Sequence, residues 1–173
     1  MKEILPQAVR VAILSNTKHQ PGSAPAVRLV EDTAHALDML RRAYDAGDAD
    51  ELRAVFSRLD RRECDALFLI GDHSLVQNRM IIINAAADLG IPLICAEPLV
   101  VADGGFMCLG RNRPEIYRRL AYYVDTILKG TPPGDLPIEE PSKSTLVFNL
   151  KTAKALGITI PGPILMRADH LIE

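Results

Sequence analysis

The sequence predicts an α/β fold with a doubly wound parallel sheet. The clearest observation is the stretch 66–70, a short, continuous apolar run that is typical of a strand covered on both faces. Polar residues 71–74 interrupt it, and an apolar-rich helix is expected over 75–89, with Ser74 as its N-cap. Gly90 ends that helix, and a second buried strand is expected over 91–95. A strand–helix–strand unit with such short connections indicates parallel strands.

The first third of the chain predicts the same alternation. A strand over 9–14 leads into a polar loop over 15–25, which is followed by a helix over 26–37 and a second strand over 38–44. Asp48 and Glu51 then have the spacing of a capping box at the start of another helix. The count of strands interleaved with helices favours a doubly wound fold.

The C-terminal part continues the pattern after the paired glycines at 104–105. The expected elements are a strand over 106–109, a helix over about 114–128 capped by Asn112, a proline-rich, acidic strap over 131–143, a strand over 145–148, a short helix over 150–156 and a closing helix over 164–172. The helix at 114–128 carries an apolar stripe formed by Tyr117, Leu120, Ala121, Val124 and Leu128.

We therefore expect a single α/β domain over 1–173, in which 9–110 form the core sheet and its helices. The chain has 173 residues, of which 48% are hydrophobic, and this is enough for one domain with a sizeable core. A net charge of −2 gives no basic field for nucleic acid. The three cysteines have no disulfide-like spacing, and the four histidines have no metal-ligand spacing, so we expect neither a metal nor a cofactor.

Ligands of open parallel sheets bind outside the carboxyl ends of the strands. Polar residues that follow the predicted strands are therefore the candidate binding residues. These are Ser15, Asn16, Asp72, His73, Ser74 and Glu97. They are hydrogen-bonding or acidic groups, which suit a polar or ammonium-bearing small molecule.

An enzyme remains the alternative hypothesis: a small hydrolase or isomerase that uses Asp72 and His73 as an acid–base pair. The sequence contains no catalytic or cofactor-binding motif that would support an enzyme. It lacks a dinucleotide fingerprint, a phosphate-binding loop and a nucleophile elbow. We therefore expect no catalysis, and Asp72 is expected first of all to cap or to accept hydrogen bonds.

Several segments of the C-terminal half resemble the ABC transporter substrate-binding protein family, which has the periplasmic-binding-protein-like I fold. The similar segments occur in order and cover 104–110, 117–121, 124–130, 133–139, 148–157, 160–161 and 167–173. Segments 9–16, 66–72 and 92–95 stand where strands of the second lobe of that family are expected. The family includes binders of tryptophan and other aromatic amino acids, and its proteins have two lobes that close on a ligand.

The resemblance implies a binder of an amino-acid-like solute that works with an ABC permease, with Asn16, Asp72 and Glu97 as second-lobe contacts. The chain starts near the point where the second lobe would begin. In the family, the helix at 114–128 belongs to the other lobe, so here its stripe is expected to pack on this chain's own core or on a second copy in a homodimer. The resemblance implies the periplasm. The N-terminus carries no secretory signal, which implies the cytoplasm if the chain is complete.

Overall fold

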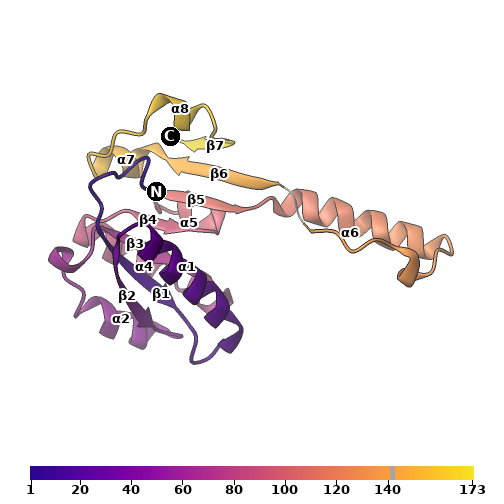
Figure 1. Cartoon of the computed structure of the whole chain (residues 1–173), viewed down its shortest axis with the longest axis horizontal. Helices are drawn as coiled ribbons and strands as arrows, with labels where there is room; N and C mark the ends of the chain where they lie inside the picture. The colour runs from indigo at the N-terminus through magenta and orange to yellow at the C-terminus, as the bar shows by residue number, and fades with distance from the viewer. Residues whose placement is uncertain (141–142) are drawn as a thin grey trace.

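The computed structural model describes residues 1–140 and 143–173, and it is built around one seven-stranded sheet (Figure 1). The strands lie in the order β2-β1-β3-β4-β5-β6-β7. Their bounds are β1 Arg10–Ser15, β2 Leu40–Asp45, β3 Ala66–Leu69, β4 Leu93–Cys95, β5 Met107–Arg111, β6 Ser144–Asn149 and β7 His170–Ile172. All neighbours pair in parallel except β5 and β6, which are antiparallel. The predicted α/β fold with a mostly parallel sheet is confirmed.

Helices cover both faces of this sheet. The α-helices are α1 Ala24–Ala36, α2 Ala49–Phe56, α3 His73–Gln77, α4 Arg79–Leu89, α5 Pro98–Ala102, α6 Arg113–Leu128, α7 Leu150–Ala155 and α8 Gly162–Leu165. Short 3-10 turns occupy Pro21–Ser23, Arg61–Glu63 and Pro133–Asp135. Helices α2, α3, α4 and α5 contribute buried residues to one core, and α1, α7 and α8 contribute to the cores on the opposite face.

The alternation of side chains along each strand assigns residues to these two faces. In β1, Ala12 and Leu14 pack on the α2–α4 side, whereas Val11 and Ile13 pack on the α1 side. Successive side chains of a strand point to opposite faces, so a strand covered on both sides must be apolar at every position. The burial of 11–15 in β1 fits this requirement.

Helix α6 and the strap that follows it form an arm that projects from the body (Figure 1). The arm begins at the carboxyl end of β5 and returns to β6. None of the residues of α6 is buried. The strap is fixed along the helix by Arg119, whose Nε donates to Glu139 at 2.6 Å, and by Tyr123, whose hydroxyl donates to the carbonyl oxygen of Pro137 at 2.8 Å. The part of the predicted strap at 141–142 lies outside the described residues.

The predicted helix over 75–89 is wrong in its start and its continuity. Asp72, and not Ser74, is the N-cap of α3, because its Oδ1 accepts a hydrogen bond from the backbone N–H of Leu75 at 2.8 Å. The helix is then interrupted at Asn78, where the side-chain amide donates to the carbonyl oxygen of Ser74 at 3.0 Å. The backbone N–H of Asn78 donates to the same oxygen at 3.0 Å, and the backbone leaves the helical geometry there, with φ −90° and ψ 14°.

Several other boundaries differ from the prediction, and two of these differences have a clear physical cause. The expected closing helix over 164–172 is instead the short α8 followed by β7. Asp169 directs the chain into the sheet there, since its backbone N–H donates to the carbonyl oxygen of Leu146 and its carboxylate accepts from the N–H of Leu146. Strand β2 begins at Leu40 rather than at Asp38, because Asp38 has a φ of 52° and ends α1 in a left-handed conformation.

Candidate functional site

The carboxyl ends of the first four parallel strands bring the candidate residues to one edge of the sheet. Leu14 pairs with Leu69, and Leu69 pairs with Cys95. Two residues beyond each of these positions, the chain reaches Asn16, Gly71 and Glu97. Since neighbouring strands lie about 4.8 Å apart, these three residues form a row across the edge. A Cβ placed on Gly71 would lie 3.4 Å from Cγ of Glu97, which confirms that these two are neighbours.

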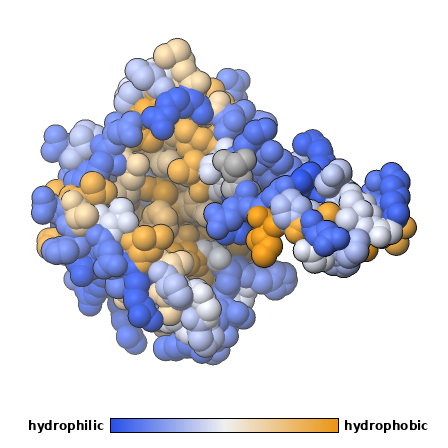
Figure 2. All heavy atoms as spheres, turned by 45° about the vertical axis from the view of Figure 1, so that its right-hand side comes forward, coloured by the Kyte–Doolittle hydropathy of each residue, from blue (hydrophilic) through white to orange (hydrophobic). Residues whose placement is uncertain are grey.

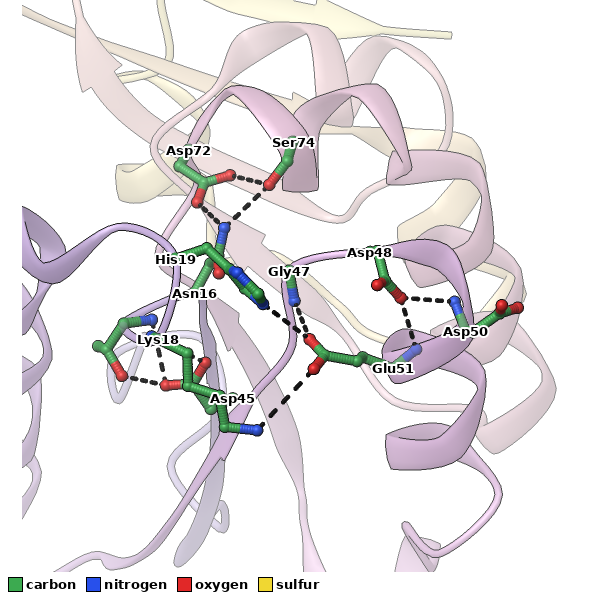
Figure 3. A network of polar contacts seen from close by, with 11 residues as sticks. Asn16, Lys18, His19, Asp45, Gly47, Asp48, Asp50, Glu51, Asp72 and Ser74 are labelled. Atoms are coloured by element: carbon green, nitrogen blue, oxygen red, sulfur yellow. Dashed lines mark hydrogen bonds and ion pairs between the residues drawn. The ribbon is translucent and has the colours of Figure 1, made fainter.

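Asn16, Asp72 and Ser74 form a closed hydrogen-bonded cluster at this edge (Figure 3). The Nδ2 group of Asn16 donates to Oδ2 of Asp72 at 2.6 Å and to Oγ of Ser74 at 3.0 Å. The hydroxyl of Ser74 in turn donates to Oδ1 of Asp72 at 2.8 Å. Because Asp72 also caps α3, one carboxylate fixes both the start of the helix and the amide of Asn16.

The carbonyl oxygen of the Asn16 side chain is the unusual atom of this cluster. Asn16 is only 2% exposed, and within 1–140 and 143–173 its Oδ1 has no hydrogen-bond partner. This oxygen points toward Gly47 after β2, where an added Cβ would lie 2.7 Å from it. A buried acceptor without a partner costs about 1–3 kcal/mol. Such a group is typical of a site that a ligand or water completes.

A second polar network lies next to this cluster and was not predicted as part of the site (Figure 3). The carboxylate of Glu51 accepts from the backbone N–H of Gly47 at 2.7 Å and lies 3.5 Å from Nε2 of His19. Asp45, the last residue of β2, accepts from the backbone N–H of Thr17 at 3.1 Å. The capping-box spacing had drawn attention to Glu51. In a capping box its carboxylate would accept from the backbone N–H of the N-cap Asp48, but here it accepts from the N–H of the preceding residue, Gly47. Asp45 could have been found from the sequence, because it is a carboxylate at the end of a predicted strand.

Ser15 and His73 do not join the cluster. Ser15 precedes Asn16 on an extended strand and therefore faces the opposite side of the sheet. It is 2% exposed, and its hydroxyl donates to the carbonyl oxygen of Tyr44 at 3.5 Å. His73 is exposed, and its Nε2 lies 2.7 Å from Nε2 of Gln77. Asp72 and His73 thus have different partners, and this arrangement gives no support to an acid–base pair.

Glu97 lies at the same edge but is engaged by the arm. Its carboxylate accepts from Nη2 of Arg113 at 2.6 and 2.7 Å. A surface cavity of about 360 Å³ lies beside this ion pair and is also lined by Ile116 and Tyr117 of α6. Figure 2 shows a hollow in the body, with hydrophobic residues in the hollow and hydrophilic residues around it. The edge therefore offers polar groups and apolar surface side by side.

The described part of the chain contains no set of three His, Cys, Asp or Glu residues placed to hold a metal ion. Among the described helices, none has both the length and the hydrophobicity that crossing a bilayer requires. Asn16, Asp72, Ser74 and Glu97 offer hydrogen bonding and charge pairing at the edge of the sheet.

The mostly parallel sheet and the helices on both of its faces place the chain in the class of periplasmic-binding-protein-like α/β folds. The family model described as "ABC transporter substrate binding protein" matches residues 1–172, and the chain belongs to this family. Members of the family typically act in the periplasm or outside the cell, and they are substrate-binding proteins rather than enzymes. The resemblance inferred from the sequence is confirmed.

A curated relative is the tyrosine-binding protein of Clostridioides difficile, 23% identical over 158 residues, which are 91% of this chain and 45% of that protein. A similar solved structure is an ABC domain from Streptococcus pneumonia in complex with L-Trp. Its TM-score is 0.86 at 20% identity, and the match covers 99% of this chain and 59% of that one. A conserved domain protein from Vibrio cholerae has a TM-score of 0.82 at 30% identity, covering 98% and 57%. The chain thus spans about half the length of these relatives.

Proposed function

We propose that this chain binds an amino acid, or a similar ammonium-bearing solute, at the carboxyl edge of its sheet. The observation that carries the proposal is the buried Oδ1 of Asn16, which has no partner among the described residues. An ammonium group has three donors and no acceptor. It can therefore donate to this oxygen and at the same time face the carboxylate of Asp72, which holds the amide of Asn16 at 2.6 Å.

The class of side chain follows from the surroundings and from the relatives. Hydrophobic residues gather in the hollow of the body (Figure 2), and apolar side chains of α6 border the cavity at Glu97. Small-molecule sites commonly combine such apolar surface with a few placed polar groups. The relatives include a protein named for tyrosine binding and a structure with L-Trp. We therefore propose an aromatic amino acid as the ligand of this chain.

Isothermal titration calorimetry with L-Trp and L-Tyr tests the proposal. The matched probes are the same side chains without the amino group, indole-3-propionate and 4-hydroxyphenylpropionate. The proposal predicts heat with the amino acids and at least a tenfold weaker response with the deaminated analogues, because the ammonium group loses its contacts to Asn16 and Asp72. Equal affinity for both kinds of compound would contradict recognition of an ammonium group.

The Asp72→Asn variant separates the binding role of Asp72 from its capping role. Asparagine is as good an N-cap as aspartate, so the free energy of unfolding should change by less than about 0.5 kcal/mol through the cap itself. The lost negative charge should weaken amino-acid binding at least tenfold. Asp48→Asn is the matched control, because Asp48 caps α2 in the same way through the N–H groups of Asp50 and Glu51. Equal losses of affinity in both variants would contradict the assignment.

In the cell, the proposed role is delivery of the solute to the permease of an ABC transporter. This role and the periplasm as its place of action rest on the family alone. Since the chain spans about half of its relatives, these statements are proposals for a whole protein of this family. Co-purification with a permease from membranes is the direct check, and a protein that never associates with one would contradict it.

The apolar stripe of α6 was expected to pack either on this chain's own core or on a second copy. In the described structure it does not pack on the core, since no residue of α6 is buried. Tyr117, Leu120 and Val124 are 65%, 52% and 56% exposed. We propose the second copy as partner, through antiparallel pairing of two α6 helices about the point midway between Ala121 and Tyr122. That arrangement would bring Arg118 of one copy beside Asp125 of the other, so opposite charges would flank the apolar contact.

Sedimentation analysis tests this dimer. The chain should sediment as a dimer at micromolar concentration, and Val124→Glu should convert it to a monomer because the charge would lie in the apolar contact. Ala26→Glu, on the exposed first turn of α1, is the control and should leave the dimer intact. A monomeric chain with unchanged secondary structure would rule out the second copy.

A further inference from the structure

Two cysteines face each other across the centre of the sheet. Cys95, the last residue of β4, is the register partner of Cys108 in β5. Both side chains lie in the same core cluster, on the face covered by α2, α4 and α5, and the two residues are 2% and 0% exposed. Side chains of directly paired residues on one face are close neighbours. The sequence separation of 13 positions gave no sign of this pairing.

The two thiols influence each other's acidity. Contact with the Cys108 side chain is the main cause that holds the pKa of Cys95 below its usual value, and contact with Cys95 is the main cause that raises the pKa of Cys108. The thiol of Cys95 donates to the carbonyl oxygens of Glu97 at 3.3 Å and of Met107 at 3.8 Å. Of the two sulfurs, Cys95 is therefore the more acidic, and thiol oxidation begins at the more acidic sulfur.

The backbone geometry permits a bond between them. Neighbouring strands are about 4.8 Å apart, and Cα atoms joined by a disulfide are usually about 4.4–6.8 Å apart. We propose that Cys95 and Cys108 form an oxidative modification site, in which hydrogen peroxide converts the buried dithiol into a cross-strand disulfide. The proposal does not rest on the amino-acid binding proposed above, although the Cys95 thiol bonds to the backbone of Glu97 at the same edge of the sheet.

The reaction balances in two steps. The Cys95 thiolate attacks one oxygen of the peroxide, the O–O bond breaks, and with one proton the products are a sulfenic acid on Cys95 and water. The sulfur of Cys108 then attacks the sulfur of Cys95, its proton leaves with the sulfenic oxygen as a second water, and the S–S bond forms. Two thiols are oxidised by two electrons, and one peroxide is reduced to two waters.

The crowding around the pair limits which oxidant can act. A Cβ added at Gly110 would lie 3.1 Å from the sulfur of Cys108 and would overlap the carbonyl oxygen of Ala96. A bulky adduct therefore has no room here, whereas peroxide is only slightly larger than water. Cys64 provides an internal comparison, because it is equally buried but its pKa is raised, chiefly by burial, and its sulfur lies 3.7 Å from the carbonyl oxygen of Asp60.

Mass spectrometry of the intact chain tests the proposal. After reduction, removal of the reductant and exposure to equimolar peroxide, the mass should fall by two hydrogen atoms. Thiol titration in denaturant should then find one of the three thiols remaining, and peptide mapping should find the remaining thiol at Cys64 and the bond between Cys95 and Cys108. Addition of dithiothreitol should restore all three thiols, because a bond between directly opposed strands is strained.

Variants that each lack one cysteine identify which two thiols form the bond. Cys64→Ser should form the disulfide like the parent chain, whereas Cys95→Ser and Cys108→Ser should not lose two hydrogen atoms within one molecule. The measurement on the parent chain stands even if a variant fails to fold. Three intact thiols after oxidation, addition of oxygen without a bond, or a bond that includes Cys64 would each overturn the proposal. None of these readouts depends on ligand binding.

Discussion

At the scale of single residues, the position of a side chain on one face of the sheet decides its role. Ser15 and Asn16 are adjacent and both are 2% exposed, yet Ser15 bonds to the backbone of β2 and Asn16 joins Asp72 and Ser74. The polar residue types at the strand ends could be read from the sequence, and three of the six candidates come together. Which of them share a face could not be read, because it depends on where each strand stops.

The same scale contains a pH-dependent ion pair at the opposite edge of the sheet. The side chain of Arg10 donates to Asp65 at 2.6 Å, and the backbone N–H groups of Val9 and Arg10 donate to the same carboxylate at 2.9 Å. The hydrogen bond from Arg10 lowers the pKa of Asp65 in the folded chain. Since an aspartate in the unfolded chain titrates near pH 3.9, this pair stabilises the fold fully above about pH 4.

Stability from this pair is therefore lost as the pH falls through the lowered pKa of Asp65. We expect urea denaturation of the parent chain between about pH 5 and pH 2.5 to show a free energy of unfolding that falls with acidification. The Asp65→Asn variant should be less stable than the parent chain at neutral pH, and its free energy of unfolding should fall less steeply as the pH is lowered. If the free energy of unfolding fell equally steeply with acidification in both proteins, this would contradict a role for Asp65.

At the scale of elements, the strands were easier to predict than the helices. Continuous apolar runs such as 66–70 define buried strands without ambiguity. The interruption at Asn78, in contrast, has no signal in the sequence, because an apolar pattern continues across it. Strand β7 was missed for a related reason, since 170–172 form a strand only because β6 lies beside them.

The pairing of β4 with β5 depends on a glycine, which gives a prediction at this scale. A methyl group at Gly110 would overlap the carbonyl oxygen of Ala96 and crowd Cys108. Gly110→Ala should therefore lower the free energy of unfolding by about 1–3 kcal/mol. Gly22→Ala is the control, because nothing lies within 4 Å of its added methyl group. Urea denaturation measures both, and a Gly110→Ala variant as stable as the control would show that β4 and β5 can separate without cost.

At the scale of the whole molecule, the structure is a body with a binding edge and an arm that leaves from that edge (Figure 1). The arm exposes apolar residues that the sequence pattern assigned to a buried stripe, including Leu128 at 81%. The fold and the family could be predicted because both depend on patterns that run along the chain. The surroundings of α6 could not be predicted, because its apolar stripe is exposed in this chain and the sequence does not name a partner for it.

The central claim is that the Asn16, Asp72 and Ser74 cluster receives the ammonium group of an amino acid. A ¹⁵N NMR titration of the chain with L-Trp tests it most directly, because the side-chain amide of Asn16 gives its own signals. We predict chemical-shift changes at Asn16, Gly47 and 71–75 that saturate with ligand and that are lost in Asp72→Asn. Unchanged signals at this edge at millimolar ligand, or changes confined to the arm, would contradict the account.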